Sequence, residues 1–352
     1  MQRNLSPQQM FERLASKHVP QYRFPGASRA EFDRWKSAAL PKVLATLGEA
    51  PPPAAGGLNP ELIVEYEHDG LIKQRWWIDV QDELSAILVI AWPKDAPAGR
   101  KLPAILCCHG HGPFGKEPVM GNASTPELRA QIDAHNYSYG HQMAKKGFVT
   151  FAIDWIGFGD RCDTNKPNHR NQAGGRDWCN VYYLHATMLG MTSLSINIAH
   201  GKAAIDFALS RPNVDPAHLG VMGLSGGGTM ALWMALAEPR IQAAEVICYS
   251  DLWECFGIRD TNYCGMQVAP GLFKLVDLPD LQGLLAPRPL LVDIGIYDDC
   301  FRVDSAMPCY KQVERIYAAA GSSDRLWLDL HTGQHGWGGN KAPAFFGKYL
   351  GA

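Results

Sequence analysis

The pattern of hydrophobic and polar positions changes character near Leu62. Before it, apolar residues recur at helical spacing around 7–16 and 29–47, and a run rich in proline and glycine follows at 51–57. A run of that composition is typical of a linker or turn. The pattern therefore predicts an N-terminal helical extension with its linker over residues 1–57, and a main domain over 58–352.

From Leu62 onward, short stretches of β type replace the helical spacing. Three of them, at 62–67, 72–80 and 84–92, are separated only by brief turns, which favours antiparallel pairing. Apolar strands then alternate with helical segments, a rhythm typical of a parallel sheet with crossover helices. These later strands are predicted at 103–108, 148–154, 218–223, 243–249, 289–294 and 325–331, with helices at 139–146, 196–210, 226–237, 303–320 and 342–349.

Two segments, 160–195 and 251–286, interrupt this alternation. Both are long, irregular in pattern and rich in aromatic residues. Loops of that length in a compact domain usually form lids or walls of functional sites. We therefore expect a single α/β domain that carries these two segments as insertions.

Composition and charge exclude several classes of function. The 352 residues are 46% hydrophobic and 19% charged, which suits a globular core. The 33 basic and 35 acidic side chains leave a net charge of -2, so no global field attracts nucleic acid or an anionic membrane. The sequence indicates neither kind of partner and leaves the oligomeric state open.

Cysteine usage and the absence of long apolar runs bear on the compartment. Nine cysteines are an odd number for a closed set of disulfides, and they show no CxxC spacing. The first twenty residues lack the apolar core of a signal peptide, and no run of 18 apolar residues occurs. We expect a soluble cytoplasmic protein with reduced thiols.

The strongest chemical signal is Gly223-Leu-Ser-Gly-Gly227, between an apolar strand and a helix-forming stretch. A strand, a sharp turn and a helix with serine at the turn form a nucleophile elbow, in which flanking glycines avoid steric clashes. A simpler interpretation is a glycine-rich helix start capped by a serine. The context favours Ser225 as a nucleophile.

A nucleophilic serine needs a histidine base, and the histidine needs a carboxylate that fixes its tautomer. A strand at 290–294 is followed by Asp298 and Asp299, and the last strand is followed by His331 and His335. We predict Asp298 as the acid, with Asp299 in reserve, and His335 as the base because glycines surround it. Asp251, after the preceding strand, is a weaker candidate for the acid.

His331 and His335 could also be written as an HxxxH metal pair. That spacing places two ligands on one face only in a helix, and Gly333 and Gly336 argue against a helix here. The sequence therefore indicates neither a metal site nor another cofactor.

A second glycine-rich run, 109–115, follows the strand at 103–108. Acyl transfer requires backbone N–H groups that stabilise the oxyanion. One donor in such sites is the residue after the nucleophile, here Gly226, and the other comes from a loop in this position, here His111 or Gly112. We predict His111 as the second donor.

The same run also contains Gly110-x-Gly112-x-x-Gly115, a dinucleotide-binding pattern, and this is the main rival interpretation. It requires a helix to begin at once, whereas Pro113 and Pro118 interrupt any helix there.

A third run, 154–161, joins the end of a strand to a glycine turn. Its charges suggest a structural loop in which Asp154 or Asp160 pairs with Arg161. Trp155 could form a wall of the substrate pocket. The aromatic side chains of the two long segments could line the site or pack beneath a lid; they are Trp178, Tyr182, Tyr183, Trp253, Phe256 and Tyr263.

With these motifs in place, the chain from about Leu62 to Leu350 resembles the α/β-hydrolase superfamily. The stretch 211–228, which contains Ser225, looks like the acetyl xylan esterase and dienelactone hydrolase-like branch, and the runs at 109–112 and 154–159 sit where that branch has its oxyanion loop and next strand-end turn. The resemblance implies a mostly parallel sheet of eight-strand type and a triad of Ser225, Asp298 and His335.

We therefore expect a cofactor-independent serine esterase that acts on a small-molecule ester, with a short acyl group, through an acyl-enzyme intermediate. A carbon-carbon bond or lactone hydrolase is the alternative on the same fold. A nicotinamide-dependent oxidoreductase and a non-catalytic hydrolase-like binding protein are the alternatives from other classes.

Overall fold

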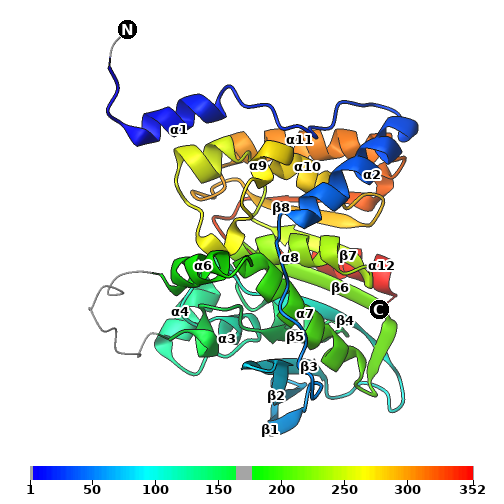
Figure 1. Ribbon diagram of the computed structural model, residues 1–352. Helices are drawn as coiled ribbons and strands as arrows, with labels where there is room; N and C mark the ends of the chain where they lie inside the picture. The colour runs from blue at the N-terminus through cyan, green and yellow to red at the C-terminus, as the bar shows by residue number, and fades with distance from the viewer. Residues whose placement is uncertain (1–2, 164–176, 352) are drawn as a thin grey trace, which may run out of the picture.

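The computed structural model describes residues 3–163 and 177–351 (Figure 1). Within these residues a nine-stranded sheet runs through the molecule in the order β1-β2-β3-β5-β4-β6-β7-β8-β9. The strands are β1 (Glu61–His68), β2 (Leu71–Gln81), β3 (Leu84–Pro93), β4 (Leu102–Cys108), β5 (Val149–Ile153), β6 (Val214–Leu224), β7 (Ile241–Ile247), β8 (Leu290–Gly295) and β9 (Leu326–His331).

The pairing confirms the predicted change from antiparallel to parallel strands. β1, β2 and β3 form an antiparallel meander, and β3 pairs antiparallel with β5. From β5 to β9, every neighbouring pair is parallel. The ends of β6, β8 and β9 therefore reach the same edge of the sheet, where the candidate residues follow them.

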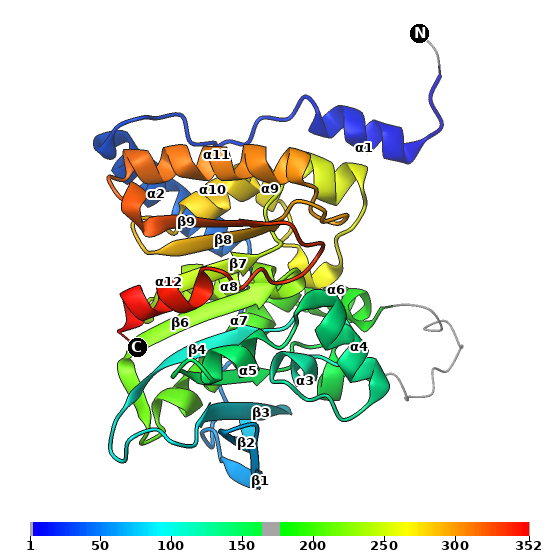
Figure 2. The ribbon, with the colours of Figure 1, turned by 180° about the vertical axis from the view of Figure 1, so that it is seen from behind.

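Helices cover both faces of the sheet. The longer helices are α1 (Pro7–Ala15), α2 (Arg29–Ala45), α4 (Pro126–His135), α6 (Trp178–Met188), α7 (Ser193–Leu209), α8 (Gly226–Ala237), α11 (Val303–Ala319) and α12 (Ala342–Leu350). Shorter ones are α3 (Lys116–Val119), α5 (Tyr139–Ala144), α9 (Leu272–Leu275) and α10 (Leu278–Gly283). Figure 1 shows α7 and α8 on one face, and Figure 2 shows α5 and α12 on the other. The predicted mostly parallel sheet with helices on both faces is confirmed.

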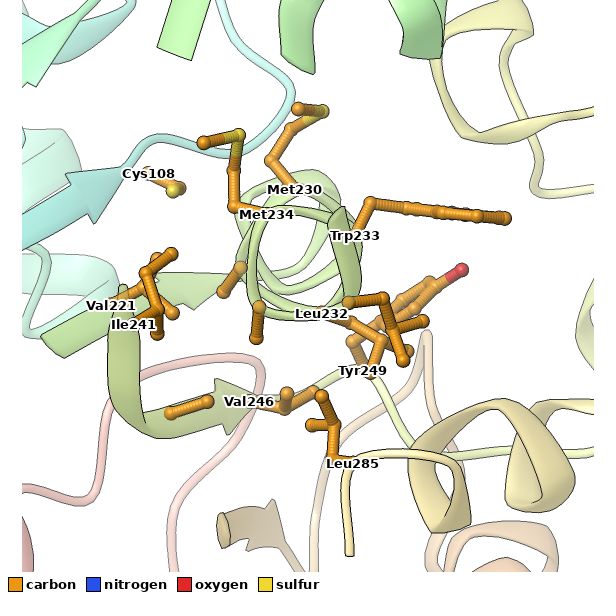
Figure 3. Close-up of a cluster of buried hydrophobic side chains, with 14 of the residues drawn as sticks. Cys108, Val221, Met230, Leu232, Trp233, Met234, Ile241, Val246, Tyr249 and Leu285 are labelled. Atoms are coloured by element: carbon orange, nitrogen blue, oxygen red, sulfur yellow. The ribbon is translucent and has the colours of Figure 1, made fainter. Parts of the chain in front are cut away.

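Helix α8, which follows the serine motif, is buried along almost its whole length. It carries apolar side chains on all sides, among them Trp233 and Met234, and Tyr249 lies close to it (Figure 3). A helix that is apolar all round can lie only inside a core. The helix that carries Ser225 at its start is thus held rigidly between the sheet and the layer outside it.

The N-terminal helices differ in how they pack. Helix α2 begins with a capping box at Ser28 and Glu31, and it buries Phe32 and Trp35 in the same hydrophobic cluster as β8 and α11. Helix α1 leaves Phe11 and other apolar side chains largely exposed. Helix α2 is therefore part of the main core, although the sequence pattern set it apart from the sheet.

The two long segments contain more regular structure than their pattern predicts. The described parts of 160–195 include α6 and the start of α7, while residues 164–176 of that segment lie outside the described residues. The segment 251–286 contains a π-helix, η2 (Glu254–Arg259), a short 3-10 helix, η3 (Gly265–Gln267), and α9 and α10. Helix α6 is rich in aromatic and β-branched residues, whose helix propensity is low, so its packing on η3 must sustain it.

In the described part of the chain, we find no helix that is both long and apolar enough to cross a bilayer.

Candidate active site

Ser225 lies in the sharp turn between β6 and α8. Its backbone has φ +60° and ψ −120°, a conformation that a residue with a side chain rarely adopts. A Cβ on Gly223 would come 2.3 Å from the oxygen of Gly227, and one on Gly227 would come 2.0 Å from the oxygen of Cys108. The two glycines of the motif are therefore sterically required, and the turn has the geometry of a nucleophile elbow.

Asp298 and His335 lie side by side in the loops after β8 and β9. The Nδ1 atom of His335 is 2.8 Å from Oδ2 of Asp298. The other carboxylate oxygen, Oδ1, accepts the backbone N–H groups of Cys300 and Phe301, at 2.8 and 2.9 Å. Because an ionised carboxylate only accepts hydrogen bonds, Nδ1 carries the proton and Nε2 of the neutral ring is left as the acceptor.

The electrostatics favour the charged form of Asp298. Burial by itself raises the pKa of this carboxyl, but the hydrogen bond and charge of His335 and the amide of Phe301 outweigh burial, so the pKa is lowered from its ordinary value. The side chain is thus a buried anion beside the imidazole, as a residue that orients a base and stabilises its charged form must be.

The remaining acid and base candidates occupy other places. Asp299 is exposed. Asp251 is buried, and its carboxylate accepts the backbone N–H of Leu252. Burial raises the pKa of Asp251 to about 7. His331 donates from Nε2 to Asp293, at 2.9 Å, and accepts the N–H of Gly333 at Nδ1. The structure thus brings Asp298 and His335 together and gives His331 a structural partner.

Three buried carboxylates that the motif analysis missed hold the loop of His335. Glu245 accepts the indole N–H of Trp337 at 2.9 Å, Asp293 accepts the N–H of Gly338 at 3.0 Å, and Asp329 accepts from Asn340 and Lys341. The signal was present in the sequence, because each acid interrupts an otherwise apolar strand, and buried carboxylates need partners.

The ring of His335 is fixed by two aromatic neighbours. It stacks on Phe301, with ring centroids 5.8 Å apart and an interplanar angle of 13°. The ring of His135 lies edge-on to it, and Nδ1 of His135 donates to the backbone oxygen of His335 at 2.5 Å. The position of the imidazole therefore depends on α4 and on the acid loop as well as on its own loop.

Backbone contacts connect the elbow to the histidine loop. The N–H of Ser225 donates to the oxygen of Ile247 at 2.9 Å, and the thiol of the next residue, Cys248, donates to the oxygen of Gly336 at 3.4 Å. The end of β7 thus lies between the two loops and contacts both.

The loop after β4 packs directly against the elbow. A Cβ on Gly110 would lie 3.3 Å from Cβ of Ser225, and a Cβ on Gly226 would lie 3.4 Å from the backbone nitrogen of His111. The N–H of Gly110 donates to the hydroxyl of Tyr137 at 2.6 Å. Next to it, Gly112 lies against the side chain of Gln131. The amides of His111 and Gly226 are therefore close neighbours beside Ser225, which suits a pair of oxyanion donors.

The dinucleotide interpretation finds no support in the helix that follows this loop. Gly115 has φ +53° and is followed by α3, which is only four residues long. A pyrophosphate site needs a crossover helix whose N-terminus faces the ligand, and a single turn supplies only a weak dipole.

Trp155 does not form an exposed wall. Its side chain is fully buried, and its backbone N–H donates to Nε2 of His109 at 2.9 Å. The neighbouring Ile156 lines a cavity of about 530 Å³ together with Trp77 and Tyr182, and the residues that line this cavity include none of the three triad candidates. Trp155 therefore supports the start of the 109–115 loop through His109.

The predicted pairing of Arg161 is also corrected. Nζ of the fully buried Lys116 contacts Asp154 at 2.7 Å and Asp160 at 2.6 Å, whereas Arg161 donates to the backbone oxygen of Asp154 and to His200. Lys116 pairs with both carboxylates because it lies at the start of α3, a helix that the sequence pattern did not predict. Of the aromatic residues in the long segments, Trp253 and Phe256 are buried.

Comparisons with known proteins agree with this architecture. "Putative hydrolase YtaP" of Bacillus subtilis (strain 168) is 28% identical over 230 residues, which cover 63% of this chain and 69% of the relative. Two solved structures share the fold. A "putative acetyl xylan esterase" from Bacteroides fragilis has a TM-score of 0.73 at 19% identity and covers 94% of this chain and 83% of its own. A "Glucuronoyl Esterase from Solibacter usitatus" has a TM-score of 0.63 at 15% identity and covers 89% of this chain and 92% of its own.

The sequence model of the Abhydrolase family matches residues 1–316, which is most of the chain and includes the elbow and Asp298. This match rests on the sequence, while the strand order, the elbow and the two solved structures support the fold independently. The chain belongs to the Abhydrolase family and has the α/β-hydrolase fold.

Proposed function

We propose that this protein is a serine hydrolase that cleaves a carboxylic ester of a small molecule. The observation that carries the proposal is the contact of 2.8 Å between His335 and a buried Asp298, at the sheet edge where Ser225 sits in its strained turn. Family membership and the esterases among the structural neighbours support the same class of reaction.

The reaction follows from the roles of these groups. Ser225 attacks the ester carbonyl while Nε2 of His335 takes its proton, and Asp298 stabilises the imidazolium that forms. The amides of Gly226 and His111 stabilise the oxyanion of the tetrahedral intermediate. The protonated His335 then gives its proton to the leaving alcohol, and an acyl-enzyme remains on Ser225. Water, activated by the same histidine, hydrolyses it.

We propose a short acyl group or a carbohydrate ester as the substrate class. The neighbours named putative acetyl xylan esterase and glucuronoyl esterase carry names that refer to esters of sugars, and they match most of this chain in fold. A carbon-carbon bond or lactone hydrolase would use the same residues on another scissile bond. Product analysis over a panel of acetyl, methyl and lactone substrates separates these reactions.

We also place the protein in a reducing compartment such as the cytoplasm. The nine cysteines are an odd number for a closed set of disulfides, and thiols such as those of Cys107 and Cys309 are buried in the core.

The decisive experiment compares the wild type with Ser225→Ala on a p-nitrophenyl acetate type substrate. We expect kcat to fall by a factor of at least about 1,000, because removal of the nucleophile leaves only the oxyanion donors and substrate binding. A fluorophosphonate probe should label the wild type at Ser225 and leave the variant unlabelled. Retained turnover in a correctly folded Ser225→Ala would refute the proposal.

A further inference from the structure

Three side chains of the types that bind transition metals converge beside the oxyanion loop. They are His111, Cys179 at the start of α6, and Cys264 immediately before η3, and their ligand atoms all lie within 4.8 Å of one another. The three residues come from three separate segments of the chain, so no spacing motif in the sequence predicts the cluster.

The distances fit a tetrahedral site. Bonds of about 2.3 Å to sulfur and about 2.0 Å to nitrogen, at a tetrahedral angle, place the two ligand atoms about 3.5 Å apart. Sγ of Cys179 is 3.6 Å from Nε2 of His111. The imidazole is held in this orientation by Phe158, whose ring lies edge-on to it with centroids 5.2 Å apart.

The cluster is closed on its sulfur side and open on its histidine side. Cys179 is 2% exposed and Cys264 is 8% exposed, whereas the side chain of His111 is 46% exposed. Oδ2 of the exposed Asp177 lies 3.6 Å from Nε2 of His111. An ion could therefore enter from solvent, with a carboxylate or water available for a fourth position.

The two thiols lie next to each other and share a hydrogen bond. Metal ions bind the thiolate form, and a bound divalent ion would deprotonate the second thiol as well.

We propose that His111, Cys179 and Cys264 bind a zinc ion, with Asp177 or water as the fourth ligand. Two thiolates and an imidazole favour zinc over magnesium or calcium, which take oxygen ligands. The site is additional to Ser225, Asp298 and His335, and it takes no part in the proton transfers proposed above.

The ion would join three segments that border the candidate active site. Gly265 follows Cys264, and its N–H donates to the side chain of Asn180 at 2.7 Å, so α6 and η3 are already in contact. Met266 lies next to the elbow, because a Cβ on Gly226 would come 2.8 Å from its methyl carbon. The zinc would therefore fix both long segments on the loop that carries the His111 amide.

The test measures metal binding directly and is independent of hydrolysis. The full chain and its Ser225→Ala variant are reduced with a phosphine, stripped with a chelator and titrated with Co²⁺, a spectroscopic substitute for zinc. We expect saturation at one Co²⁺ per chain, with thiolate-to-cobalt charge transfer and the strong visible bands of a tetrahedral site. Zn²⁺ should displace the cobalt, and it should raise the melting temperature of the stripped protein.

Matched variants locate the site. Cys179→Ser and Cys264→Ser should each weaken Co²⁺ binding by at least about tenfold, since even the loss of an outer-shell partner has an effect of that size. Cys255→Ser and His185→Ala, a half-buried cysteine and an exposed histidine outside the cluster, should bind as the wild type does. Asp177→Asn should weaken Co²⁺ binding if the Asp177 carboxylate is the fourth ligand. If water is the fourth ligand, this variant should bind Co²⁺ as the wild type does.

Three results would overturn the proposal. The first is the absence of stoichiometric cobalt binding in the reduced wild type, which needs no variant to fold. The second is binding that both serine variants retain in full. The third is a Cys179–Cys264 disulfide, seen by peptide mass spectrometry of protein purified without reductant, together with failure of the reduced protein to bind metal.

Discussion

Nδ1 of His335 donates to Oδ2 of Asp298 over 2.8 Å, while the adjacent Asp299 is exposed to solvent. Two neighbouring carboxylates in one loop thus have separate environments. The backbone decides between them, because the N–H groups of Cys300 and Phe301 turn the loop around Oδ1 of Asp298. This relationship makes the two aspartates a matched pair for mutation.

We predict that Asp298→Asn lowers kcat for the proposed ester hydrolysis by a factor of about 10,000, whereas Asp299→Asn changes it by less than about threefold. An amide can donate to Nδ1 and so favours the wrong tautomer of His335, an effect of this size in other triads. Steady-state kinetics on one ester would measure both. Equal losses in the two variants would assign the acid role to the pair rather than to Asp298.

The elbow glycines provide a prediction about stability. Gly227→Ala should lower the free energy of unfolding by more than about 4 kcal/mol, because its Cβ would come 2.0 Å from the oxygen of Cys108. Gly99→Ala is the control. Gly99 has φ +78° and its Cβ would meet nothing within 4 Å, so strain alone should cost about 1 kcal/mol. Urea denaturation of both variants tests this difference, and a loss in Gly227→Ala no greater than in Gly99→Ala would refute the steric argument.

The buried Glu245 should affect how stability depends on pH. Burial and the charge of Asp293 raise the pKa of this carboxyl well above 4.5, so the folded state holds a proton that the unfolded chain releases above that pH. Folding therefore binds a proton there, and this group lowers stability as pH rises, by up to about 1.4 kcal/mol per pH unit.

Glu245→Gln replaces the ionisable carboxyl with an amide that does not bind or release a proton in this pH range. The glutamine oxygen can still accept from Trp337, so the loop of His335 keeps this contact. Above about pH 4.5, we expect the slope of the free energy of unfolding against pH to be less negative in Glu245→Gln than in the wild type. Chemical denaturation at several pH values provides the two slopes, and parallel slopes would show that Glu245 is ionised in the folded protein.

The buried ion pair between Lys116 and Asp154 gives a further prediction. Lys116→Met leaves Asp154 buried without its lysine, which should destabilise the protein by about 3–5 kcal/mol. Lys116→Met combined with Asp154→Asn should be more stable than Lys116→Met alone, since the second change removes the unpaired charge. Thermal unfolding of the two variants compares them. A double variant that is less stable than the single one would mean that the hydrogen bonds accepted by the Asp154 carboxylate outweigh the cost of its unpaired charge.

The sequence pattern was most informative where a single segment contains the whole signal. The helix at 226–237 was predicted with the bounds that the structure has, because Gly226 and the run of good helix formers lie next to each other. The antiparallel start of the sheet was also predicted, from turns too short for a crossover. Helix α6 was missed, because its low propensity is compensated only by contacts with η3.

In the candidate site, too, some features have a local signal in the sequence and others depend on tertiary contacts. Motif and order along the chain selected Ser225, Asp298 and His335, and the structure places the last two in contact. Trp155 is fully buried, which the sequence could not indicate because the direction of a side chain after a strand depends on what packs against it. Glu245 and Asp293 were overlooked, although an acid within an apolar strand is a recognisable signal.

By itself, the sequence determined the strands, the parallel core and the serine turn, because steric limits and burial patterns act over a few neighbouring residues. Only the tertiary structure decided which aspartate meets His335, which cation pairs with Asp154, and that His111, Cys179 and Cys264 lie together. These relationships join residues that are far apart in the chain. Their distances are set by how the sheet and helices pack, and packing is a property of the whole molecule.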